Sequence, residues 1–192
     1  MKNRRTIFVC QGTGCQSGGS ADVYQALQNE ISKLKLDDVK VDFSGCHGFC
    51  EQGPNVVVEP DGIFYTHVQA EDAKDIAEQH MKNGKPVERL FYTDPATGKP
   101  EAEYSKINFY AKQQRITMRN CGHINPESID DSIESGGYSA LGKALKMTPQ
   151  AVINEMKKSG LAGRGGAGYP TYLKWQACHD ADGDTKYVIC NA

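Results

Sequence analysis

Several signals that would narrow the function are missing from this sequence. Its longest purely apolar runs are only a few residues long, such as residues 56–58, whereas a bilayer-spanning helix needs about 20. The formal net charge of -2 gives no reason to expect binding to nucleic acid or to an anionic membrane. The basic N-terminus is followed by a short apolar run, residues 7–9, too short for a signal peptide. We therefore expect a cytoplasmic protein with no nucleic-acid partner and no direct membrane insertion.

The distinctive feature of the chain is its cysteines, seven in all, four of which form two tight pairs. Four residues separate Cys10 from Cys15, and three separate Cys46 from Cys50. In a chain without an export signal, this pairing favours metal over disulfide. The spacing favours a 2Fe-2S cluster, with zinc and a redox disulfide or free thiols as alternatives. The other cysteines are expected to be buried structural thiols: Cys121, Cys178 and Cys190.

The first part of the chain predicts strands and helices in the order β-α-β-β-β-α. Residues 6–10 form an apolar run suited to a buried strand, and apolar residues at helical spacing follow Ser20. Residues 39–43 alternate as a half-buried strand does, and residues 56–65 contain an Asp-Gly turn typical of a hairpin. Residues 73–81 predict a second amphipathic helix. This is the order of a small thioredoxin-like α/β domain, with each cysteine pair in a loop directly after a strand.

Glycines surround both cysteine pairs, at Gly12, Gly14, Gly45 and Gly48. Glycine allows backbone conformations with positive φ and leaves amides free to point at sulfur. Such amides would stabilise the negative charge of a cluster. His47 lies inside the second pair, but four cysteines complete a ligand set, so we expect it to be a loop histidine.

A polar stretch rich in proline and glycine, residues 84–105, is typical of a linker or a long surface connection. We therefore predict one domain over residues 1–83 and a second region over residues 106–192. Capping and apolar spacing predict three helices in this second region. The first starts at Asn125, the second contains Leu141, and the third starts at Thr148.

A glycine-rich loop follows the last of these helices and satisfies G-x-G-x-x-G over residues 163–168. The dinucleotide fingerprint requires a strand immediately before it, and here a helix precedes the loop, so a standard Rossmann site is not expected. The loop still favours an anionic ligand. Arg164 and Lys174 bring positive charge, and a helix beginning at Pro170 offers its N-terminal amides. A flexible surface loop is the alternative.

The first cysteine-containing segment resembles a known family. Residues 10–53, with their CxxxxC and CxxxC pairs, resemble the thioredoxin-like 2Fe-2S ferredoxins. Members of that family occur as the small iron-sulfur subunit of NADH dehydrogenases and as N-terminal modules of hydrogenase flavoprotein subunits. The resemblance implies the thioredoxin-like fold and a 2Fe-2S cluster on the four cysteines.

The glycine-rich loop resembles a second family. Residues 163–175 and 187–192, with a lead-in over residues 119–141, resemble the start of the FMN- and NADH-binding subunit of NADH dehydrogenase and of NAD(P)-linked hydrogenases and formate dehydrogenases. The resemblance implies that the FMN is lined by Gly163, Arg164, Gly165, Gly166, Lys174 and Asn191. It also implies that Tyr169 stacks near the nicotinamide of NAD(P)H.

That family continues beyond the last residue of this chain, into the rest of the flavin fold and a cysteine motif for a 4Fe-4S cluster. The chain thus resembles roughly the first third of a longer subunit. The expected fold class is α/β, with the ferredoxin domain followed by a mostly helical lead-in to an incomplete FMN-binding α/β domain.

The function that this resemblance implies is electron transfer between NAD(P)(H), FMN and iron-sulfur clusters. The setting would be a soluble hydrogenase or formate dehydrogenase complex, or an NADH dehydrogenase, with the other subunits as partners. No residue of the chain itself is expected to be catalytic. The alternatives are a stand-alone 2Fe-2S electron carrier with a docking segment, and a structural zinc module.

Overall fold

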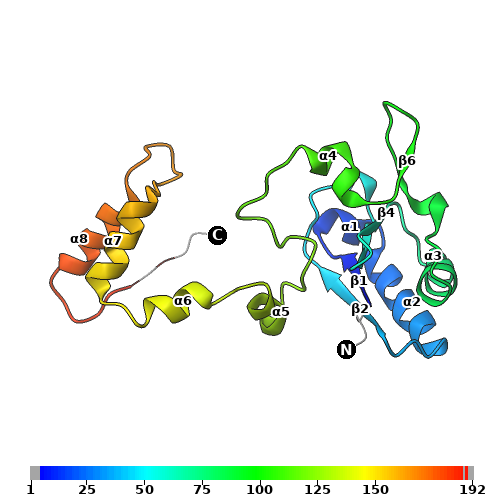
Figure 1. The fold of residues 1–192 in the computed structure, drawn as a ribbon, viewed down its shortest axis with the longest axis horizontal. Coiled ribbons are helices and arrows are strands. Elements are labelled where there is room, and N and C mark those ends of the chain that lie inside the picture. Colours follow the sequence, from blue (N-terminus) through cyan, green and yellow to red (C-terminus); the bar gives the residue numbers. More distant parts are fainter. Residues whose placement is uncertain (1–4, 188, 190–192) are drawn as a thin grey trace. The chain divides into compact units, whose positions relative to one another are not determined.

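The structure is a computed structural model, which describes residues 5–187 and residue 189 (Figure 1). Contacts within the chain divide it into two compact units, Met1–Ser135 and Gly136–Ala192. Within the described ranges, no helix combines the length and the apolar character needed to cross a membrane.

The first unit is built on a sheet of four strands in the order β2-β1-β3-β4. Strand β1 (Arg5–Cys10) is parallel to β2 (Val39–Ser44) and antiparallel to β3 (Val56–Glu59), which pairs antiparallel with β4 (Ile63–Tyr65). Parallel neighbours need a crossover connection, and α2 (Ser20–Lys33) supplies it between β1 and β2. The strands and helix crossover predicted along the chain, and the predicted hairpin, are confirmed.

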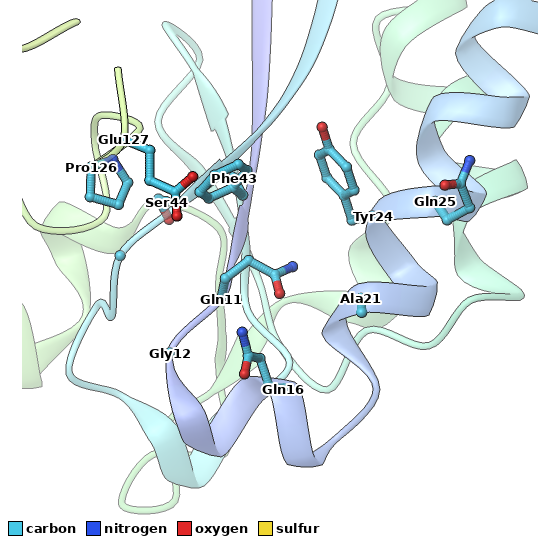
Figure 2. A pocket seen from close by; sticks show the side chains of 11 residues that line it. Gln11, Gly12, Gln16, Ala21, Tyr24, Gln25, Phe43, Ser44, Pro126 and Glu127 are labelled. Atoms are coloured by element: carbon cyan, nitrogen blue, oxygen red, sulfur yellow. The ribbon is translucent and has the colours of Figure 1, made fainter. Parts of the chain in front are cut away.

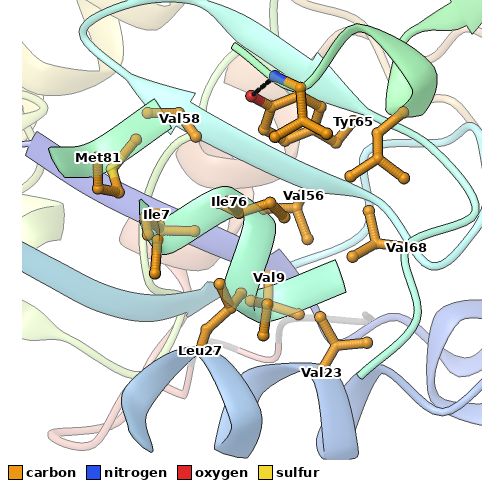
Figure 3. Packing of buried hydrophobic residues seen from close by; sticks show 14 of the residues in the cluster. Ile7, Val9, Val23, Leu27, Val56, Val58, Tyr65, Val68, Ile76 and Met81 are labelled. Carbon is orange, nitrogen blue, oxygen red and sulfur yellow. Dashed lines mark hydrogen bonds between the residues drawn. The ribbon is translucent and has the colours of Figure 1, made fainter. Parts of the chain in front are cut away.

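One face of the sheet packs against helices (Figure 3). These are α2 and a second helical run, formed by α3 (Asp72–Asp75) and the π-helix η2 (Ile76–Lys82). Both runs bury the apolar residues that helical spacing selects: Val23, Leu27 and Ile31 in the first, and Ala73, Ile76, Ala77 and Met81 in the second. The predicted helices and their core faces are therefore confirmed.

The opposite face of the sheet has its own core. Because side chains alternate along a strand, Phe8, Val57 and Phe64 point away from the helices. They are covered by residues after the hairpin, chiefly Ile107 and Tyr110, which lie at η4 (Tyr104–Lys106) and α4 (Asn108–Ala111). The sheet is thus enclosed between helices on one side and the 104–111 segment on the other.

The stretch predicted to be a linker, residues 84–105, packs on the first unit. Val87 and Leu90 belong to the helix-side core, and the backbone N–H of Val87 donates to the hydroxyl of Tyr65 at 3.0 Å. The 3-10 helix η3 (Glu88–Leu90) and the short pair β5 (Tyr92–Thr93) and β6 (Pro100–Glu101) complete the stretch. Chain contacts place the boundary between the two units after Ser135, so the division at residues 84–105 stays a prediction.

Helix α5 (Ile129–Glu134) starts later than predicted. Its N-cap is Ser128, whose hydroxyl accepts a hydrogen bond from the N–H of Asp131 at 3.1 Å. Asn125, the predicted cap, accepts the N–H of Glu127 at its Oδ1 at 2.9 Å and donates its side-chain N–H to Asp42 at 2.8 Å. The predicted helix start is wrong because Asn125 closes a local turn onto the N–H of Glu127, and the helix begins only after Ser128.

The second unit contains α6 (Ser139–Ala144), α7 (Pro149–Ser159) and α8 (Thr171–Asp180). Helix α7 begins as predicted, with the Thr148 hydroxyl accepting from the N–H of Ala151, and Gly160 ends it in the left-handed conformation at φ 66°. Helices α7 and α8 are joined by hydrogen bonds of 2.9 and 3.2 Å between the side chains of Gln150 and Gln176.

Candidate functional site

The two cysteine pairs meet beyond the C-terminal ends of the parallel strands β1 and β2 in the first unit. Cys10 ends β1, and Cys15 lies on the short helix α1 (Thr13–Ser17), so the prediction that this pair lies in a loop is wrong. Cys46 follows β2, and Cys50 opens the 3-10 helix η1 (Cys50–Gln52). Parallel pairing sets Cys10 opposite Ser44, so both chain segments leave the sheet at the same edge.

The four sulfurs form a connected set. Those of Cys46 and Cys50 are 3.5 Å apart, and the side chains of Cys15 and Cys46 lie close enough to Cys10 to shift its pKa. Cys15 and Cys50 are close enough to interact electrostatically. The structure therefore brings together all four cysteines that the sequence singles out.

Backbone amides point at three of the sulfurs. The donors are the N–H groups of Gly12 and His47 to Cys10, of Asn55 to Cys15, and of Gly48 to Cys46, the last at 3.2 Å. The hydrogen bond from Cys15 lowers the pKa of Cys10 to about 6. The same bond raises the pKa of Cys15, and burial raises that of Cys46. Of these three thiols, Cys10 is therefore the one on whose sulfur the site stabilises negative charge.

Three glycines let the cysteine-bearing loops approach closely. A Cβ atom added to any of them would come within 3.1 Å or less of a cysteine atom, whereas carbon atoms in ordinary contact are about 3.5–4.0 Å apart. The close approaches are Gly12 to Cys46, Gly14 to Cys50, and Gly53 to Cys15. Gly45, by contrast, has open space where its Cβ would be. Gly53 was not predicted, although it follows the second pair by only three residues.

The site is buried at one end and open at the other. Cys10 and Cys15 are buried, Cys46 is half-buried and Cys50 is exposed. A cleft of about 560 Å³ adjoins the loops, and Gly12 and Gly45 form part of its wall together with Tyr24 and Phe43 (Figure 2). A charge held by the sulfurs would therefore lie close to the protein surface.

His47 is buried, with only 1% of its surface exposed. Its Nε2 lies 3.0 Å from the carbonyl oxygen of Gly122, to which it donates, and the rings of Phe64, Tyr104 and Tyr110 surround it. Burial lowers the pKa of His47 to about 3, so the ring is neutral near pH 7. The histidine was predicted to be only a loop residue, and this structural role was missed.

The chain segment that receives this hydrogen bond is here named the return segment, residues 113–125. It touches the sheet and the second cysteine loop through several polar contacts. These are Arg115 Nη2 to the carbonyl oxygen of His47 at 2.9 Å, His123 Nδ1 to Glu59 Oε1 at 3.2 Å, and Asn125 Nδ2 to Asp42 Oδ1 at 2.8 Å. The return segment is thus part of the surroundings of the site.

The remaining cysteines do not follow the prediction. Cys121 is half-buried and Cys178 is exposed, so the expectation of buried thiols is wrong for both. Cys178 lies on α8, which has no buried residue. Cys190 lies outside the described residues.

Backbone hydrogen bonds join the two ends of the glycine-rich loop in the second unit. The N–H of Gly163 donates to the carbonyl of Tyr169 at 2.7 Å, and the N–H of Thr171 donates to that of Leu161 at 3.0 Å. Lys174 reaches across from α8, because a Cβ on Gly163 would meet its Nζ at 2.8 Å.

The other predicted flavin residues differ in what the structure shows of them. Arg164 bonds to the carbonyl of Ala162, and Gly165 and Gly166 have open space beside them. The side chain of Tyr169 is exposed, and Asn191 lies outside the described residues. One short stretch of chain therefore contains Arg164 in the loop, Lys174 on α8, and open space beside Gly165 and Gly166.

Between residues 5 and 187, no three His, Cys, Asp or Glu side chains surround a point suited to one metal ion. A 2Fe-2S cluster does not require such a group, since each of its irons takes two protein ligands.

Comparison with known families matches both ends of the chain. Residues 1–81 match the family described as thioredoxin-like 2Fe-2S ferredoxin, and residues 156–192 match the one described as Nuo51 FMN-binding domain.

Individual relatives repeat this division. A 2Fe-2S ferredoxin of Clostridium pasteurianum is 39% identical over 93 residues, which are 44% of this chain and 91% of the ferredoxin. The HndC subunit of the NADP-reducing hydrogenase of Solidesulfovibrio fructosivorans is 56% identical over 81 residues, 42% of this chain and 16% of that subunit. The alpha subunit of the NAD-reducing hydrogenase HoxS of Cupriavidus necator is 29% identical over 191 residues, 97% of this chain and 29% of that subunit.

The chain thus spans most of the length of the small ferredoxin but less than a third of the two hydrogenase subunits. Through its first 81 residues it belongs to the thioredoxin-like 2Fe-2S ferredoxin family, and its last part is similar to the FMN-binding domain of the Nuo51 type.

Proposed function

We propose that Cys10, Cys15, Cys46 and Cys50 bind a 2Fe-2S cluster and that the chain transfers electrons through it. The observation that carries the proposal is the convergence of these four thiols, which come from two loops at one edge of the sheet. The donor set fits the cluster, since thiolates are its usual ligands and backbone N–H groups already point at the sulfurs.

The cysteines of the site differ in exposure and therefore have different proposed roles. When bound, the cluster supplies one-electron chemistry, accepting and releasing a single electron. Cys10 and Cys15 hold the buried side and exclude water there, whereas Cys50 lies at the surface where an electron partner can approach. The N–H groups of Gly12 and Gly48 stabilise the negative charge that accompanies reduction.

For the second part of the chain, we propose the beginning of an FMN site, lined by Gly163, Arg164, Gly165, Gly166, Lys174 and Asn191. The match of residues 156–192 to an FMN-binding domain supports it, as does the approach of Lys174 to Gly163. Backbone amides and cations at the start of a helix suit the phosphate of FMN. Tyr169, whose side chain is exposed, would stack near the nicotinamide of NAD(P)H.

These sites suggest a role within a larger assembly. We propose residues 1–83 as the ferredoxin domain, 84–105 as the connection and 106–192 as the start of the flavin domain. The activity would be electron exchange between NAD(P)H, FMN and iron-sulfur clusters in a cytoplasmic complex. Relatives named as hydrogenase subunits, and an NADH-quinone oxidoreductase component of Aquifex aeolicus that is 51% identical over 65 residues, support subunits of such complexes as partners. We include formate dehydrogenase subunits among the proposed partners, because their complexes also exchange electrons with NAD(P)(H).

The cluster is tested by metal analysis, acid-labile sulfide and EPR spectroscopy of the anaerobically purified, dithionite-reduced chain. We expect equal amounts of iron and sulfide and the signal of a reduced 2Fe-2S cluster. Cys46→Ala removes a ligand atom and should abolish the visible absorption, whereas Cys121→Ala, at another half-buried cysteine, should keep it. Zinc without sulfide, or an unchanged Cys46→Ala spectrum, would contradict the ligand set.

The flavin is tested separately by denaturing the purified protein and measuring released FMN. Recovery of FMN with the protein supports the flavin site. Iron-sulfur absorbance without flavin supports the alternative of a carrier that acts alone.

A further inference from the structure

Arg115, in the return segment, places its guanidinium group beside the second cysteine loop. Its Nη2 donates to the carbonyl oxygen of His47 at 2.9 Å. The guanidinium carbon lies 4.9 Å from the centre of the Tyr110 ring, and Nε donates to Gln113 Oε1 at 3.1 Å. The arginine is thus held by an aromatic ring and by a side-chain amide, with its charge directed at one backbone carbonyl.

That carbonyl belongs to the same peptide group as the N–H of Gly48. The Gly48 N–H donates to the sulfur of Cys46 at 3.2 Å. The contacts therefore form a chain from Arg115 through the His47–Gly48 peptide to Cys46. A hydrogen bond to the carbonyl end of a peptide polarises it and strengthens donation from its N–H, and a charged donor does so more than a neutral one.

We propose that Arg115 raises the reduction potential of the cluster by polarising the His47–Gly48 peptide toward the sulfur of Cys46. This inference rests on the proposed 2Fe-2S site. Reduction adds an electron to an already anionic group, so a stronger N–H donor to a ligand sulfur stabilises the reduced form more than the oxidised form. The positive charge of the arginine acts in the same direction.

The conformation of the cysteine loop suits this relay. Gly48 has φ +85°, in the left-handed region that favours glycine, so the chain turns directly after the N–H that donates to Cys46, and a Cβ added there would lie 3.6 Å from Arg115 Nη2. The ring of His47, on the same peptide, is anchored through Nε2 to Gly122 of the return segment. Two contacts from the return segment thus hold the peptide that donates to Cys46.

Arg115 lies outside residues 1–81, which match the ferredoxin family. The segment that leads toward the second unit therefore contributes a determinant of cluster potential that the family match alone does not contain. Arg115 acts here as a positioning residue, since it touches the ligand only through a peptide.

The test is a redox titration of the full chain monitored by EPR, comparing Arg115→Gln with Arg119→Gln. Arg119 is an exposed arginine of the same segment, so its variant makes the same change in net charge without touching the cysteine loop. We expect Arg115→Gln to shift the midpoint potential to more negative values and Arg119→Gln to leave it at the wild-type value. Equal potentials in the two variants would refute the relay.

A second pair covers the case in which Arg115→Gln assembles no cluster. Arg115→Lys keeps a positive charge but replaces the planar guanidinium by a more strongly hydrated ammonium, so a smaller negative shift is expected than for glutamine. Arg119→Lys is its control, and again equal potentials overturn the proposal. Absence of a 2Fe-2S signal from the wild-type chain would instead refute the proposed function.

Discussion

The close approach of Gly12 to Cys46 leads to a sharp prediction about Gly12→Ala. An ideal Cβ at this position lies 2.9 Å from the Cβ of Cys46, 3.3 Å from its Sγ and 3.4 Å from its Cα. Carbon atoms in contact prefer about 3.5–4.0 Å, so the two loops must separate by at least about 0.5 Å. Rotating a side chain cannot relieve this, because two of the three atoms, Cα and Cβ, move only with the backbone.

The magnitude follows from known costs. Overpacking a tight site costs about 1–3 kcal/mol. Gly12 is also the N-cap of α1, where alanine is worse than glycine by about 0.5–1 kcal/mol, but alanine lowers the entropy of the unfolded chain by a similar amount. We therefore expect Gly12→Ala to lower the free energy of unfolding by about 1–3 kcal/mol. A bound metal site tolerates ligand displacements of only about 0.2 Å, so cluster content should fall as well.

Gly45→Ala is the matched control. Gly45 precedes Cys46 directly, and a Cβ there meets nothing within 4 Å. We expect this variant to keep its cluster and to have a stability equal to wild type or up to about 1 kcal/mol higher. Iron per chain, the ratio of visible to protein absorbance, and denaturant unfolding of the apo-protein measure the difference. Equal cluster content and equal stability for Gly12→Ala and Gly45→Ala would refute the claim that contact between the loops sets the ligand geometry.

Two further predictions concern other parts of the first unit. Gly122→Ala and Gly98→Ala both place alanine at positive φ, +88° and +66°, which costs about 1–2 kcal/mol in each. Only at Gly122 does the new Cβ overlap the ring of His47. Thermal unfolding should therefore show that Gly122→Ala loses a further ~1–3 kcal/mol of unfolding free energy compared with Gly98→Ala. Equal melting temperatures for the two variants would count against docking of the return segment on His47. Burial lowers the pKa of His80 and outweighs the opposing effect of Asp61. The unfolded chain therefore binds a proton at His80 more readily than the folded chain does, and the free energy of unfolding should fall as the pH drops below about 6.5. His80→Gln should reduce that slope in melting curves recorded between about pH 8 and pH 5, and parallel curves would contradict the assignment.

Local sequence patterns predicted the parts of the fold that depend on neighbouring residues. Apolar spacing located the core of α2, an Asp-Gly turn located the β3–β4 hairpin, and strand ends followed by cysteines located the candidate site. The glycines near the cysteines were only partly predicted: Gly48 has the positive φ that was expected, Gly12 and Gly14 instead allow a close approach, and Gly45 shows neither feature. Such signals lie within a few residues of what they predict.

The contacts that were missed join residues far apart in sequence. His47 meets Gly122 across 75 positions, and the acceptor is a backbone carbonyl, which every residue has. Asn125 was predicted to start a helix; it closes a local turn onto Glu127, and its side-chain N–H bonds to Asp42, 83 positions away. Polar contacts of this kind leave no periodicity in the sequence, and so the return segment could not be predicted from a pattern.

The second core of the sheet has a practical consequence for protein engineering. Phe8, Val57 and Phe64 lie within the family match of residues 1–81, yet Ile107 and Tyr110, which cover them, lie well beyond it. A chimera joined at residue 81 would leave a phenylalanine-rich sheet face open to solvent, which favours aggregation. Transfer of this domain into another protein should therefore take the chain through Tyr110 at least, since the unit of packing is longer than the unit of sequence similarity.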